Sequence, residues 1–65
     1  MTYRQGAYVW DEAHGKVGEV MEERLGVVYL RPVSGGKEWP AKRRMLRLAT
    51  RDEKTAAGVA VDTSV

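Results

Sequence analysis

Few residues of this sequence have side chains suited to catalysis, and the most suggestive pair is Asp11 with His14. Asp11 and Glu12 precede the only histidine, and Gly15 follows it. A carboxylate that orients an imidazole is part of a catalytic triad, but a triad also needs an activated nucleophile. Ser34 and the other hydroxyl residues lie in expected loops or tails, without the strained elbow that activates a serine. We therefore expect His14 to be a solvated turn residue and the protein to be no enzyme.

Metal and phosphate sites are equally poorly supported by the sequence. Glu19, Glu22 and Glu23 could gather around a cation, but a solvated strand end explains them as well. The run Ser34–Lys37 contains Gly-Gly-Lys but lacks the longer spacing and the following helix of a phosphate loop. With no cysteine and one histidine, thiolate sites and histidine-rich sites are excluded. We expect no metal and no cofactor.

Binding is better supported, because the positive charge is concentrated in one block. The formal net charge is +2, yet residues 42–51 alone carry five cations and no acid: Lys42, Arg43, Arg44, Arg47 and Arg51. We call residues 42–51 the basic block. Guanidinium groups pair with phosphate oxygens in a bidentate manner, and four of these five cations are arginine. A second reading is a solvated turn, and a third is a surface for an acidic protein.

Aromatic residues could add a stacking surface for bases or for a peptide. Tyr8 and Trp10 alternate with smaller residues in one expected strand, and Tyr29 is expected to face outward from another. Since the chain has no Phe, we expect Trp39 to lie in the core. The leading hypothesis is a weakly specific DNA- or RNA-binding accessory module. In it, Lys42, Arg43, Arg44 and Arg47 contact phosphates, and Trp10 and Tyr29 stack on bases. The alternative is a protein–protein adaptor that binds a peptide or an acidic partner.

The chain length limits how elaborate the protein can be. A chain of 65 residues makes one small domain, which buries only about 60% of its unfolded surface. There is no apolar run of membrane-spanning length and no apolar segment typical of a signal peptide near the first residue. We expect a cytoplasmic monomer that does not enter a membrane.

Short apolar runs separated by turn residues predict a small β-protein. The expected strands are 7–10, 16–22, 27–31 and 37–39, with the turn at Gly35-Gly36 between the last two. Alternation along these strands predicts a core, and Gly18 would leave room for a close crossing strand. The expected core residues are Val9, Val20, Val28 and Leu30, together with Leu48 where its segment forms a further strand.

The segment 41–49 is ambiguous by its periodicity. Ala41, Met45, Leu48 and Ala49 have helical spacing, and Pro40 suits the first position of a helix. Leu46 and Leu48, however, alternate with their neighbours as in a strand. Both interpretations remain open on periodicity alone.

A resemblance favours the strand. The pattern Gly6-x-x-Val9-x-Asp11, Gly15-x-x-Gly18-x-Val20 and Val28-x-Leu30 resembles the first half of KOW-type and other SH3-like small barrels. The sequence is also similar to short hypothetical actinobacterial proteins of no settled activity, through stretches like 17–21, 30–33 and 35–39. The resemblance covers about residues 5–49. It implies an all-β fold, a five-stranded SH3-like barrel over residues 1–51, with a 3₁₀ turn at 40–44 and a last strand near 46–49.

Residues 52–65 differ in composition from the rest of the chain. They contain charged residues and small apolar ones such as Ala56 and Val59, with no large apolar side chain. Such a segment buries too little surface to offset the entropy of ordering it. We expect a flexible, disordered C-terminal tail. The alternative is that residues 59–61 add a strand to an open sheet edge.

Overall fold

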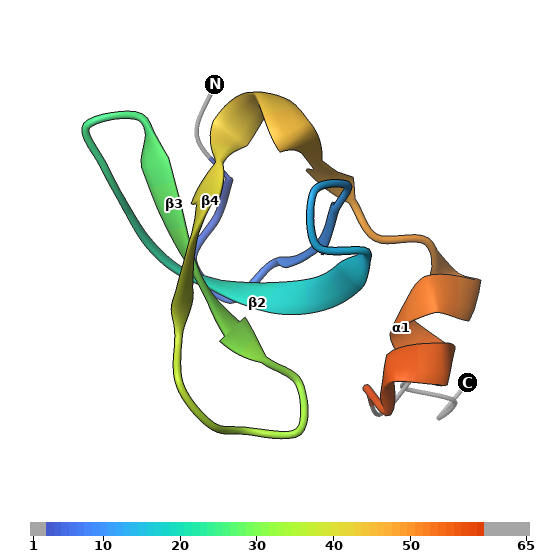
Figure 1. Cartoon of the computed structure of the whole chain (residues 1–65). Coiled ribbons are helices and arrows are strands. Elements are labelled where there is room, and N and C mark those ends of the chain that lie inside the picture. The colour runs from blue at the N-terminus through green and yellow to red at the C-terminus, as the bar shows by residue number, and fades with distance from the viewer. Residues whose placement is uncertain (1–2, 60–65) are drawn as a thin grey trace.

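The fold is five short strands followed by one short helix, seen here in a computed structural model that describes residues 3–59. Figure 1 shows the elements in order along the chain. Their bounds are β1 Tyr8–Asp11, β2 Lys16–Arg24, β3 Val27–Pro32, β4 Trp39–Lys42, the 3₁₀ turn η1 Arg43–Met45, β5 Leu46–Leu48 and α1 Arg51–Ala57.

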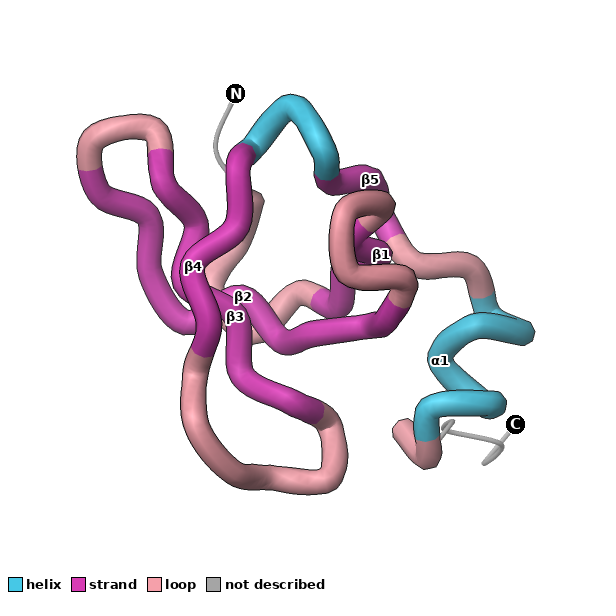
Figure 2. Tube along the Cα trace, viewed as in Figure 1, coloured by secondary structure: helices cyan, strands magenta, loops and turns pink. Residues whose placement is uncertain are grey.

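All five strands belong to one antiparallel sheet, ordered β4-β3-β2-β1-β5. The two edge strands, β4 and β5, are neighbours in sequence, and η1 carries the chain from one edge to the other (Figure 2). The all-β expectation, with five strands and a 3₁₀ turn before the last, is confirmed. The helical alternative for 41–49 is wrong. Ala41 lies in β4 and pairs with Val28, and the chain then makes only one 3₁₀ turn before β5.

Strand β2 is the longest and bends the sheet. Its register with β3 shifts between Val20 and Glu22, so a β-bulge lies at the middle of the strand. Bulges increase the local twist and redirect the strand. As a result, one half of β2 pairs with β1 and the other half extends with β3 into a projecting hairpin (Figure 1).

The core lies on the inner face of this bent sheet. It consists of one residue or more from every strand: Val9, Val20, Val28, Leu30, Ala41 and Leu46. The partly buried Trp39 packs against it. A Cβ added at Gly18 would lie 2.7 Å from Cη2 of Trp39 and 2.9 Å from Cβ of Leu30. Glycine at position 18 is therefore what lets the indole and β3 approach this closely, as the sequence led us to expect.

One predicted core residue is wrong. Leu48 is 64% exposed, whereas Leu46 is only 8% exposed. Leu48 is the last residue of an edge strand of three residues, and the chain turns away after it. Leu46, two residues earlier and opposite Asp11 of β1, fills the expected core position.

The fourth strand and the 3₁₀ turn lie later than predicted. β4 begins at Trp39 and includes Pro40, and the 3₁₀ turn begins at Arg43. Proline is tolerated there because β4 is an edge strand, where a missing N–H removes no ladder bond on the open side.

Residues 51–57 form helix α1, whereas the sequence predicted a disordered tail from residue 52. Thr50 accepts a hydrogen bond from the Glu53 N–H, and the Glu53 carboxylate accepts one from the Thr50 N–H. This is a capping box, which satisfies two N–H groups that a helix start leaves free. Gly58 ends the helix with φ 94°, a left-handed conformation suited to glycine. Of the alternative strand at 59–61, residues 60 and 61 lie outside the described residues.

Candidate nucleic-acid interface

The fold distributes the basic block over four elements. Lys42 ends β4, Arg43 and Arg44 lie in η1, Arg47 is in β5 and Arg51 begins α1. Because the chain changes direction at each of these elements, the five cations do not form one surface. Each has to be judged by its own neighbours.

Arg47 is held by two carboxylates. It donates to both oxygens of Glu53, at 2.8 and 2.6 Å, and to Oε1 of Glu12 at 3.3 Å. The hydrogen bond from Arg47 holds the pKa of Glu53 at about 2, so the carboxylate is ionised at neutral pH. The guanidinium also lies 5.7 Å from the centre of the Trp10 ring. Arg47 therefore joins β5 to the β1–β2 turn and to the helix, and its charge is already compensated.

Trp10 lies on the outer face of β1, beneath the helix. It stands opposite Val17 on one side and Arg47 on the other. Val17 is 5% exposed without belonging to the inner core, because α1 covers this part of the outer face. A hollow of about 430 Å³ remains there, lined in part by Trp10, Val17, Ala56 and Ala57.

A second group of cations meets at the far end of the sheet. Strand register places Arg24 opposite Val27, and Val27 opposite Lys42. Paired residues share a face, so Arg24 and Lys42 flank Val27 on the outer face. Arg43 and Arg44 follow directly, and a shallow hollow of about 350 Å³ is lined by Gly26 and residues 42–44. We call Arg24, Lys42, Arg43 and Arg44 the cationic hairpin surface.

The charges of this surface are only partly compensated. Among the ion pairs of the described residues, none involves Lys42 or Arg44. Arg43 lies 3.5 Å from Glu23, and one buried nitrogen of its guanidinium has no hydrogen-bond partner within the structure. Arg24 makes a long contact of 3.9 Å with Glu22, and both side chains are more than half exposed.

Tyr29 is the aromatic residue nearest to these cations in the strand register. It stands between Glu22 and Pro40 on the same outer face, two pairs further along the strands than Arg24 and Lys42. Diagonal neighbours across strands lie about 7–8 Å apart, within reach of a long side chain. Tyr29 and Trp10, proposed together from the sequence, thus stand beside different halves of β2: Tyr29 opposite Glu22 after the bulge, and Trp10 opposite Val17 before it.

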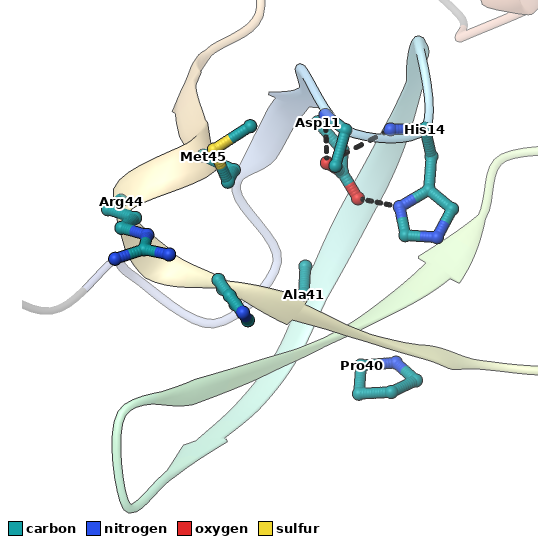
Figure 3. Close-up of a pocket in the computed structure, with 8 residues that line it drawn as sticks. Asp11, His14, Pro40, Ala41, Arg44 and Met45 are labelled. Atoms are coloured by element: carbon teal, nitrogen blue, oxygen red, sulfur yellow. Dashed lines mark hydrogen bonds and ion pairs between the residues drawn. The ribbon is translucent and has the colours of Figure 1, made fainter.

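A third cluster surrounds Asp11 at the β1–β2 turn. The side chain of Asp11 is 1% exposed, and its oxygens accept from the indole N–H of Trp39 at 2.8 Å and from two backbone N–H groups, those of Ala13 and His14. Nδ1 of His14 lies 2.6 Å from Oδ2 (Figure 3). Burial alone would raise the pKa of Asp11, but the hydrogen bonds of Trp39, His14 and the turn together lower it.

The pocket beside Asp11 has a volume of about 340 Å³. Its wall includes His14, Lys42, Arg44 and Met45, drawn in Figure 3. No serine, threonine, cysteine or tyrosine lines it, so the Asp11–His14 pair has no hydroxyl or thiol to activate within the pocket. His14 is half exposed, as expected for a turn residue, but its imidazole is held by Asp11 rather than fully solvated.

Within residues 3–59, no group of three or more His, Cys, Asp or Glu side chains is arranged to hold a metal ion. In the same part of the chain, no helix is long and apolar enough to cross a membrane.

Sequence reasoning missed Arg24 and one hydrogen bond of Asp11. Arg24 is distant in sequence from the basic block, and only the register of β2, β3 and β4 brings it beside Lys42. The two-residue turn at Leu25-Gly26 was the available signal, because such a turn sets the register of the two strands that it joins. Asp11 was recognised as a turn residue, but its bond to an indole 28 positions away depends on tertiary structure.

Comparison with known proteins adds no relative: no family model, no curated protein and no solved structure matches the chain.

Proposed function

We propose that this protein is a non-catalytic binding module for nucleic acid, with weak sequence specificity. The observation that carries the proposal is the cross-strand row Arg24–Val27–Lys42, continued by Arg43 and Arg44. It gathers four cations on one end of the sheet, and at least two of them have no ionic partner among the described residues.

Phosphate is the ligand that fits this surface. Three of the four cations are arginines, whose forked N–H groups match phosphate oxygens. The hollow beside Gly26 is shallow, so an extended nucleic-acid backbone can lie across it. Phosphate contacts position a protein without reading sequence. The surface therefore supports affinity more than specificity.

Tyr29 is the stacking residue that this geometry favours. Its ring belongs to the same face as Lys42 and Arg24, so a strand whose phosphates meet the cations would bring its bases toward Tyr29. Trp10 is separated from this surface by the bulge and lies beside Arg47 and the helix. We therefore leave Trp10 and Arg47 out of the proposed contacts.

The salt dependence of binding tests the proposal. With four cations engaged on a duplex, log K should fall with log salt at a slope of about −3.6. In the double variant Lys42→Ala, Arg44→Ala the slope should be about half as steep, since each phosphate contact contributes about 0.9. Fluorescence anisotropy with labelled single strands and duplexes of unrelated sequence measures both quantities.

The matched control removes two exposed cations elsewhere. Lys37→Ala, Arg51→Ala has the same net charge as the test variant, and neither residue belongs to the cationic hairpin surface. The control should keep the wild-type slope. Equal loss in both variants, or no binding to DNA or RNA at about 50 mM salt, would refute the proposal.

An adaptor function is the second candidate, favoured by the hollow between Trp10 and α1. Its lining is mainly apolar, including Val17, Ala56 and Ala57, and a peptide side chain could enter it. In this case, Trp10→Ala would abolish capture of the peptide while leaving the salt slope for DNA unchanged. Polyglutamate serves as the probe for an acidic partner, and strong binding to it but not to DNA would favour the adaptor.

A further inference from the structure

The tip of the β2–β3 hairpin carries a leucine that no other part of the described structure covers. The side chain of Leu25 is fully exposed, more than that of any other large apolar residue in the described part of the chain. It has φ 52°, and Gly26 after it has φ 79°. Positive φ at both central residues of a two-residue loop is the pattern of a type I′ turn.

Leucine is a poor residue for this position as far as folding is concerned. Asn, Asp and Gly are favoured in such turns, because L-residues with bulky side chains are strained at positive φ. An exposed leucine also gains nothing from burial. Residues that are unfavourable for the fold are candidates for a role in binding, and here the strain and the exposure coincide at one residue.

The surroundings of Leu25 indicate what it meets. Arg24 precedes it, and Gly26 lines a hollow with Lys42, Arg43 and Arg44. Figure 1 and Figure 2 show the hairpin tip projecting away from α1 and the rest of the sheet. The tip is therefore an apolar point with cations around its base.

A nucleic-acid duplex has the complementary arrangement, with phosphates outside and apolar stacked bases inside. Proteins that bind the minor groove insert apolar side chains, leucine among them, between base steps while cations hold the flanking phosphates. A membrane fits less well, because a single leucine offers little apolar area and the tip lacks the aromatic residues typical of membrane interfaces.

We infer that Leu25 is a wedge that inserts between adjacent base pairs of duplex DNA from the minor groove, while the cationic hairpin surface holds the phosphates on either side. The inference rests on the proposed function and narrows its ligand to a duplex that the protein bends. Tyr29 would then lie against the sugar–phosphate backbone rather than stack on a base.

The test is Leu25→Asn, with Leu25→Met as the control. Asparagine suits positive φ, so the variant should melt at the same temperature as the wild type or higher. Its affinity for duplex DNA should nonetheless fall about tenfold, from the lost burial of the leucine side chain. The salt slope should not change, because no phosphate contact is removed. Leu25→Met should keep the wild-type affinity.

Bending provides the second readout. Dyes on the two ends of a short duplex should come closer when the wild-type protein binds, and should not when Leu25→Asn binds at saturation. A base analogue that fluoresces when unstacked reports insertion directly.

The outcomes separate the wedge from the proposal beneath it. If Leu25→Asn binds as tightly as the wild type while Lys42→Ala, Arg44→Ala binds weakly, the wedge is refuted and phosphate binding stands. If the wild-type protein binds no duplex and no single strand, the wedge and the proposed phosphate binding are both refuted. Binding to phosphatidylglycerol vesicles that depends on Leu25, without binding to DNA, would assign the tip to a membrane and also refute the wedge.

Discussion

Removing the carboxylate of Asp11 should destabilise the fold more than any other single polar change. This side chain is buried, and four donors converge on it: the indole of Trp39, the ring of His14 and two turn N–H groups. It joins the β1–β2 turn to β4, two elements that are not adjacent in the sheet. The perturbations are Asp11→Ala and the isosteric Asp11→Asn.

The magnitude follows from the donors that each variant leaves unpaired. A hydrogen bond to a charged group contributes about 1.5–3 kcal/mol, and His14 is half exposed, so water can replace its bond. Asp11→Ala should therefore cost about 3–5 kcal/mol, mostly from the buried indole and turn N–H groups. A domain of this length has only about 3–10 kcal/mol of stability, so this variant could unfold.

Asp11→Asn keeps the size of the side chain and gives a measurable protein. Its amide oxygen can still accept from the turn, but its NH₂ group then faces the indole N–H of Trp39, donor against donor. The expected cost is about half that of the alanine variant, about 1.5–3 kcal/mol. Urea unfolding followed by tryptophan fluorescence measures it, because Trp39 itself reports on the contact.

The contribution of Asp11 to the free energy of unfolding should also depend on pH. The pKa of Asp11 is lowered in the folded state, so its contribution is complete above the unfolded value, near 3.8, and is lost as pH falls through the folded value. Wild-type stability should decline below about pH 4, and Asp11→Asn should decline less. Glu53, with its pKa of about 2, leaves part of the acid dependence in the variant. Equal stability and an unchanged pH profile in Asp11→Asn would refute the network as a stabilising element.

Two further predictions concern packing. Leu46→Ala should lower the free energy of unfolding in urea by about 2–5 kcal/mol, and Leu48→Ala by less than about 1 kcal/mol, because only Leu46 is buried. Similar losses in the two variants would contradict the observed register. Gly18→Ala should cost about 1–3 kcal/mol and alter the fluorescence of Trp39, since the new Cβ would lie within 3 Å of the indole and of Leu30; unchanged stability and fluorescence would contradict that close approach.

Alternation predicted most of the core because successive side chains of a strand point to opposite faces. Val9, Val20, Val28 and Leu30 were assigned from period-two patterns, and all are 2% exposed or less. The same rule failed at Leu48, because alternation gives the face of a strand but not whether another element covers its end. For an edge strand such as β5, the burial of the last residue depends on which other elements pack against it.

The helix at the C-terminal side shows a different limit. Thr50-x-x-Glu53 is a capping-box pattern, and Gly58 is a suitable C-cap, so a local signal was present. Composition outweighed it, since a segment without large apolar residues was expected to remain disordered. What composition could not show is that Arg47 binds the capping glutamate, so that the cap is also a tertiary contact.

The basic block shows why a charge run in a sequence is not yet a binding surface. Five cations within ten residues predict one patch, but a strand, a 3₁₀ turn, a strand and a helix redirect them. Glu12 and Glu53 compensate Arg47, while the hairpin register adds Arg24 to Lys42 from eighteen positions away. The proposed phosphate contacts therefore remain four, but Arg24 replaces Arg47 among them. A salt slope counts the cations engaged, and variants of individual residues show which they are, so the two measurements together distinguish the folded surface from the sequence block.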